Sequence, residues 1–129
     1  MGLDMYLVGE KYYSTYDEEC PVEDGFKLET KDLRLGYWRK HPDLHGYIVN
    51  TFADGKDECQ KIDLCEADIK QILAAIDANQ LPHTEGFFFG ASDETDKLES
   101  IEILKKALKW LAIPREQGCH KSVYYRASW

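Results

Sequence analysis

Four side chains near the middle of the sequence could form a binding or catalytic pocket. Tyr37, Arg39 and Lys40 end a predicted strand, and His45 lies one turn into a helix predicted to begin at Pro42. The first N–H groups of a helix have no partner within it and its dipole makes that end positive, so an anion is favoured there. Two cations directly before the helix strengthen this preference, and an imidazole can exchange a proton near neutral pH. The segment predicts a pocket for a phosphorylated or nucleotide-like ligand.

Asp4 and Phe88 complete this candidate pocket. Asp4 belongs to the first predicted strand, and it can share acid and base work with Tyr37 and His45 if that strand lies beside them. Phe88 is the centre of a Gly-Phe-Phe-Phe-Gly run, where an exposed ring can stack on a flat ligand. The pattern assigns no catalytic role to any of these six residues.

A simpler interpretation of the same residues stays open. Arg39 and Lys40 can extend from an edge strand into solvent, and His45 can be a hydrogen-bonded helix residue. The three consecutive phenylalanines can form a fully buried strand. Under this interpretation the segment serves the fold and binds nothing.

A metal site is the next possibility that the residue types raise. His41 and His45 stand four residues apart at the start of the predicted helix, but the glutamate of an H-E-x-x-H motif is absent. A metal would need further ligands from Asp43, His83, Cys119 or His120. The four cysteines contain no C-x-x-C pair, so we expect reduced thiols, no metal and no cofactor.

The chain is acidic, and its charges are unevenly spread. Its 129 residues include 24 acidic and 16 basic ones, for a net charge of −8, yet residues 105–129 carry six basic and one acidic. Binding to phosphates needs clustered Lys and Arg, so we expect no direct nucleic-acid binding and no attraction to a membrane. The sequence also lacks a bilayer-spanning apolar run and a signal-peptide pattern, which indicates the cytoplasm.

Acidic side chains concentrate between Ser14 and Asp32, where Pro21 and Gly25 favour turns. This stretch predicts a solvated loop with at most a short hairpin. The candidate partner surface consists of its carboxylates, Asp17, Glu18, Glu19, Glu23 and Asp24. A protein with a basic surface is the partner that such a loop would attract. A loop that only keeps the protein soluble is the alternative.

Hydrophobic periodicity predicts one α+β domain over residues 1–129. We expect strands at 3–13, 33–40, 59–64 and 121–129, and helices at 42–53, 66–79 and 93–112. The first strand should be central, with the last strand beside it. The helix at 42–53 should bury Leu44, Ile48 and Phe52 and leave Asp43 in water. The fold class is a mixed, mainly antiparallel sheet of four or five strands with about three helices packed mainly on one face.

Four segments spread over the chain together resemble a family of small uncharacterised phage and prophage proteins. They are Gly-Leu-Asp-Met-Tyr-Leu at 2–7, Gly-Tyr-Trp-Arg-Lys at 36–40, Gly-Phe-Phe-Phe-Gly at 86–90 and the Tyr-Tyr-Arg-Ala-Ser-Trp ending. The resemblance implies an accessory protein that acts in the cytoplasm of a bacterial host. It implies no reaction and no catalytic residues.

Two classes of function follow. The leading hypothesis is a phage or prophage accessory protein that binds and inhibits or modulates a host protein, such as a nucleic-acid-handling defence complex whose basic surface meets the acidic loop. The alternative is a small enzyme or ligand-binding protein that takes a phosphorylated or nucleotide-like molecule at Tyr37, Arg39, Lys40 and His45. No Gly-rich nucleotide-binding loop accompanies these residues.

Overall fold

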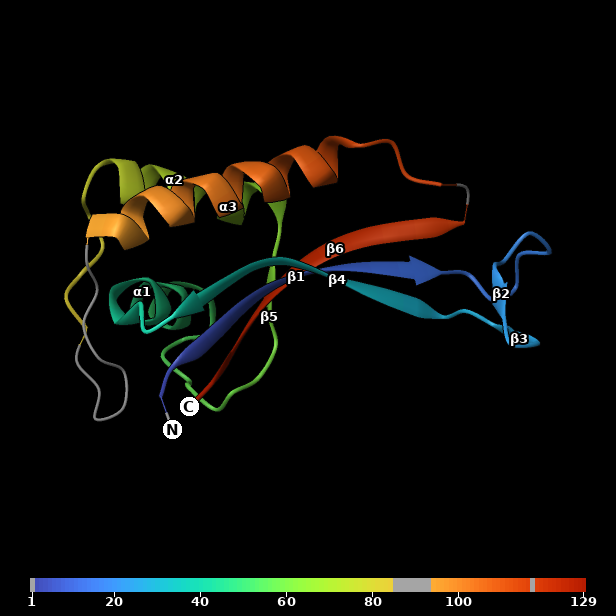
Figure 1. The fold of residues 1–129 in the computed structure, drawn as a ribbon, viewed down its shortest axis with the longest axis horizontal. Coiled ribbons are helices and arrows are strands. Elements are labelled where there is room, and N and C mark those ends of the chain that lie inside the picture. The colour runs from blue at the N-terminus through green and yellow to red at the C-terminus, as the bar shows by residue number, and fades with distance from the viewer. Residues whose placement is uncertain (1, 85–93, 117) are drawn as a thin grey trace.

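A four-stranded sheet organises the molecule (Figure 1). The computed structural model describes residues 2–84, 94–116 and 118–129. The strand order is β4 (Thr30–Arg39), β1 (Asp4–Tyr13), β6 (Cys119–Ser128) and β5 (Ile62–Leu64), and these neighbours pair antiparallel. A separate hairpin joins β2 (Val22–Glu23) to β3 (Phe26–Lys27). The expected central place of the first strand, with the last strand beside it, is confirmed.

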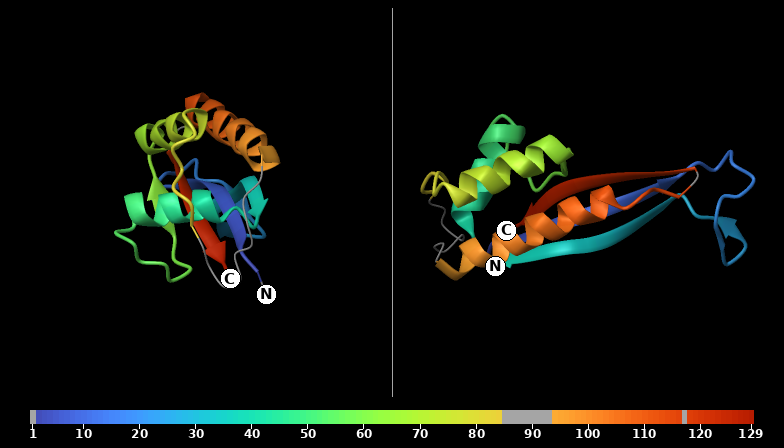
Figure 2. Two further views of the ribbon diagram at one scale, coloured as in Figure 1. Left: turned by 90° about the vertical axis from the view of Figure 1, so that its left-hand side faces the viewer. Right: turned by 90° about the horizontal axis from the view of Figure 1, so that it is seen from above.

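Three helices complete the described fold: α1 (Pro42–Phe52), α2 (Glu66–Asp77) and α3 (Glu94–Ala112). Figure 2 shows α2 and α3 side by side over one face of the sheet. All three helices contribute their buried apolar residues to the core on that face. The predicted α+β class, with a mainly antiparallel sheet and helices mainly on one face, is therefore confirmed.

Alternation along β1 separates two faces of the sheet. Met5 lies opposite Trp38 on β4 and Ala127 on β6, and Leu7 lies opposite Tyr125. Directly opposed residues share a face, and these five side chains are all buried in the core. We call this the inner face, and the opposite one the outer face. An antiparallel sheet with one covered and one open face explains the period of two in the sequence.

Close packing of α3 on the sheet depends on glycine in the central strand. A Cβ atom at Gly9 would lie 2.8 Å from Cη2 of Trp110, so any larger residue would push the indole away. Trp38 donates from Nε1 to Ser100 Oγ at 2.8 Å. The helix is thus fixed by an apolar contact at one position and by a buried hydrogen bond at another.

Several boundaries and burial states differ in detail from the sequence expectations. Leu44 and Ile48 are buried as predicted, whereas Phe52 is half-buried. Asp43 is half-buried rather than fully in water, because the chain after α2 returns to it and Thr84 N donates to its Oδ1 at 2.9 Å. β5 is shorter than predicted, and Cys59 has a positive φ of 57° that does not suit a strand.

The aromatic run at 86–90, with Phe88, lies outside the described residues. Within the described residues, no helix combines the length and the apolar character needed to cross a bilayer.

Candidate functional site

Three of the candidate pocket residues meet on the outer face. Asp4 lies opposite Arg39 in the β1–β4 register. Tyr37 donates from its hydroxyl to Asp4 Oδ1 at 2.5 Å, and Arg39 donates to the same oxygen at 3.3 Å. The hydrogen bond to Asp4 raises the pKa of Tyr37, with a smaller contribution from desolvation, while Arg39 acts against it. The charge of Arg39 is therefore already matched by a carboxylate.

Of the other described pocket residues, His45 lies apart from this cluster and Lys40 follows Arg39 directly after β4. His45 is 2% exposed and faces the core, so the structure does not bring it to the Asp4 cluster. Lys40 has a φ of 58° and donates its backbone N–H to Leu3 O at 2.8 Å. This left-handed residue turns the chain from β4 into α1.

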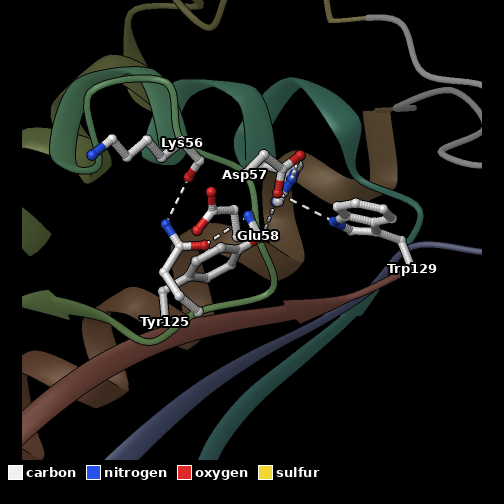
Figure 3. A network of polar contacts seen from close by, with 7 residues as sticks. Lys56, Asp57, Glu58, Tyr125 and Trp129 are labelled. Atoms are coloured by element: carbon white, nitrogen blue, oxygen red, sulfur yellow. Dashed lines mark hydrogen bonds and ion pairs between the residues drawn. The ribbon is translucent and has the colours of Figure 1, made fainter.

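His45 joins a polar network between α1, the following loop and β6. Figure 3 shows three other members of this network, Asp57, Tyr125 and Trp129. His45 Nδ1 lies 2.6 Å from the Tyr125 hydroxyl, and His45 Nε2 lies 2.9 Å from Asp57 Oδ2. The other oxygen of Asp57 accepts a hydrogen bond from Trp129 Nε1 at 3.1 Å. The Asp57 carboxylate thus contacts both His45 on α1 and Trp129, the last residue of the sequence.

Tyr125 enters this network as a protonated phenol. Burial raises the pKa of Tyr125 well above its ordinary value, with further contributions from the charges of Asp57 and Cys59. The phenol therefore keeps its proton and can serve as donor or acceptor to Nδ1 of His45, according to the tautomer of the imidazole.

The order carboxylate, imidazole, hydroxyl is also the order of a nucleophilic triad. A substrate cannot reach these groups in this structure, because Tyr125 is 1% exposed and His45 is 2% exposed. Neither residue lines the pocket near the start of α1 or the one beside β5 and β6. The arrangement accordingly ties α1 and the loop at Asp57 to the end of β6.

A pocket of about 320 Å³ lies near the start of α1. It is lined by His41, Asp43, Ile76, Asn79, Leu81, Glu94 and Lys97. The positive end of α1 already has its own carboxylate, since Asp43 lies in the first helical turn. Two carboxylates in the lining oppose an anionic ligand. The described residues contain no group of three His, Cys, Asp or Glu side chains placed to hold a metal ion.

The acidic segment forms the second candidate site. We define the acidic hairpin as residues 14–29, which include β2 and β3; it projects beyond the sheet, at the end of the molecule away from both termini (Figure 1). Glu18, Glu19, Glu23 and Asp24 are exposed, whereas Asp17 is half-buried and accepts the Glu19 N–H at 3.0 Å.

Three large apolar side chains stand among these carboxylates. The exposed fractions are 98% for Tyr16, 77% for Phe26 and 64% for Val22. Sequence reasoning found the charges but missed these three residues, because a hydrophobic residue in a predicted loop gives no signal of whether something covers it. Exposed apolar groups gathered on one projecting element are typical of a protein-binding surface.

The acidic hairpin has a fixed shape. Asp24 and Gly25 have φ angles of 54° and 86°, as a two-residue hairpin turn requires. Leu28 donates its N–H to Pro21 O at 2.8 Å, and Lys27 Nζ donates to Thr15 O at 2.5 Å. At its base, the half-buried Leu28 packs against a small buried cluster of Tyr13, Cys20 and Cys119. The exposed side chains are therefore held on a formed scaffold.

Comparison with models of protein families, with curated protein sequences and with solved structures finds no match to this chain. The acidic hairpin presents its side chains to solvent together, whereas the candidate pocket residues include the buried His45.

Proposed function

We propose that the protein is a binding module that docks its acidic hairpin onto a partner protein. The observation that carries the proposal is the exposure of Tyr16, Phe26 and Val22 among carboxylates on a projecting element. Aromatic side chains are enriched among the residues that dominate binding energy at interfaces. The partner surface that fits is an apolar pocket surrounded by Lys and Arg.

Each part of the acidic hairpin has a separate energetic role. Burying an exposed aromatic side chain contributes about 1.5–3 kcal/mol, so the apolar residues supply affinity. Rim carboxylates act mainly on the association rate by attracting a basic surface. The formed turn lowers the entropy that would be lost on binding.

The phage and prophage resemblance supports a particular class of partner. We propose an accessory protein that binds and inhibits or modulates a bacterial host protein in the cytoplasm. A host protein that handles nucleic acid has the required basic surface, because it binds phosphates with Lys and Arg. Carboxylates on the acidic hairpin would then occupy positions that phosphates otherwise take.

The alternative function, binding of a phosphorylated or nucleotide-like ligand, has less support at the site predicted from the sequence. A phosphorylated ligand held jointly by Tyr37, Arg39, Lys40 and His45 would require the histidine to face the arginine. His45 instead lies on the inner side with Tyr125, and Arg39 pairs with Asp4. A protein partner is therefore the better-supported function.

Site-specific photo-crosslinking tests this proposal. A photoreactive phenylalanine analogue at position 26 should label one discrete protein in a bacterial host lysate. The matched control is the same analogue at Leu98, another large apolar residue, 71% exposed but on α3. Stoichiometric labelling from position 26 and none from position 98 is expected. Equal labelling from both positions, or none from position 26, would contradict docking through the acidic hairpin.

A further inference from the structure

The outer face carries a cluster of tyrosine and arginine side chains at the end of the sheet away from the acidic hairpin. Tyr6 lies opposite Tyr37 on β4 and opposite Arg126 on β6. The two tyrosine rings have centroids 5.4 Å apart. The guanidinium of Arg34 lies over both rings, with Cζ 5.1 Å from the Tyr6 centroid and 5.8 Å from the Tyr37 centroid. We call Tyr6, Tyr37, Arg34 and Arg126 the arginine–tyrosine platform.

A β-bulge places Arg34 in this cluster. The register changes between Leu7, opposite Gly36, and Val8, opposite Arg34, so Leu35 has no direct partner on β1. Strict alternation from Tyr37 would have put Leu35 on the outer face and Arg34 on the inner face. Bulges that redirect a side chain in this way occur frequently next to functional sites.

The two platform arginines have no carboxylate partner among the described residues, although the chain has 24 acidic residues. Asp4, two residues from Tyr6 on β1, already accepts from Tyr37 and Arg39. Asp32, two residues from Arg34 on β4, accepts from the Tyr124 hydroxyl at 3.2 Å. Arg34 and Arg126 are both exposed. Their guanidinium groups are therefore available to bind an anion from solvent.

We propose that the platform binds a nucleotide, a ligand class with one flat base and a phosphate. The guanidinium of Arg34 lies over two aromatic rings that are tilted by 48° to each other, and a base can stack on the exposed side of this arginine. Arg126, on β6 and so on the other side of β1 from Arg34, can then form paired hydrogen bonds with the phosphate. An acidic peptide would match the charges but would leave the face of the Arg34 guanidinium without a stacking partner.

The size of the platform favours a single nucleotide over a nucleic-acid strand. It covers three neighbouring strands, about 10 Å across, and two rows of side chains, about 7 Å along. Glu10 and Asp32 lie opposite each other further along the same face. These carboxylates would repel the next phosphates of a longer chain. This site is separate from the acidic hairpin, so either proposal can fail without the other.

Calorimetric titration of the full-length protein tests the platform, with AMP, ATP, inorganic phosphate and a short oligothymidylate as the probes. ATP and AMP should bind, and phosphate alone should bind at least tenfold more weakly because it has no base to stack. Arg126→Gln should weaken ATP binding at least tenfold by removing a charge-assisted pair of hydrogen bonds. Lys105→Gln removes one charge from an exposed residue of α3 and should change nothing.

Substitutions at Tyr6 separate stacking from simple charge attraction. Tyr6→Phe keeps the ring beneath Arg34 and should retain ATP binding, whereas Tyr6→Leu should weaken it severalfold. Arg34→Gln removes the guanidinium over the two rings at an exposed position. Its ATP binding therefore tests stacking even if Tyr6→Leu does not fold. The proposal would be overturned by no binding of ATP at millimolar concentration, by equal affinity for ATP and phosphate, or by an unaffected Arg126→Gln variant. Tight, steeply salt-dependent binding of the oligothymidylate alone would equally overturn it.

Discussion

Replacing Tyr16 and Phe26 together with serine is expected to weaken partner binding at least a hundredfold and to leave the unfolding temperature unchanged. The two side chains are 98% and 77% exposed in the free protein, so they contribute little to its folding. At about 1.5–3 kcal/mol for each buried aromatic, their loss from an interface amounts to two or more factors of ten. The measurement is the Kd for the protein crosslinked through position 26, together with a thermal melt.

A second exposed apolar pair provides the control for this prediction. Leu98 and Ile113 are 71% and 56% exposed, but they lie on α3 and directly after it. The Leu98→Ser and Ile113→Ser double variant should bind the partner with wild-type affinity. A comparable loss in both double variants would mean that exposed apolar area in general, rather than the acidic hairpin, drives association.

The buried polar network should show the largest effect on stability. His45→Leu is expected to lower the free energy of unfolding by about 2–4 kcal/mol, because it leaves the hydroxyl of Tyr125 buried without its hydrogen-bond partner. Tyr125→Phe should cost less, about 1–3 kcal/mol, since His45 keeps its contact with Asp57. Urea denaturation of each variant measures both values.

The double variant identifies the contact itself. When His45→Leu and Tyr125→Phe are combined, neither side of the hydrogen bond is left unsatisfied, so the total loss should be at least about 1 kcal/mol smaller than the sum of the single losses. His120→Leu, at an exposed histidine, should stay within about 0.5 kcal/mol of wild type. Strict additivity of the two buried substitutions would mean that the hydrogen bond contributes nothing.

Much of the architecture could be predicted because it depends on local pattern. The alternation of Leu3, Met5 and Leu7 predicted the first strand, and Pro42 followed by Leu44 and Ile48 predicted the start and the buried side of α1. Each of these patterns comes from residues that are close together in the sequence. Tertiary contacts changed only the ends of the predicted strand and helix.

The site residues could not be predicted in the same way because the fold brings them together. His45 and Tyr125 are 80 residues apart, and nothing in either local sequence indicates that they meet. The bulge opposite Leu7 and Val8 moves Arg34 to the outer face, which simple alternation would have assigned to Leu35. For Phe26, the Asp-Gly turn was visible in the sequence, but its exposure depends on the absence of any described element over the acidic hairpin.

The association rate of the captured partner tests the central claim most directly. The variant for this measurement neutralises the five carboxylates of the acidic hairpin, through Asp17→Asn, Glu18→Gln, Glu19→Gln, Glu23→Gln and Asp24→Asn. Docking on a basic surface predicts slower association at low salt, by about tenfold or more, and a rate that no longer falls as salt is added. A control that neutralises Glu99 and Glu102 on α3 should keep the wild-type rate and salt dependence. An unchanged rate and an unchanged salt dependence in the hairpin variant would contradict the proposed function.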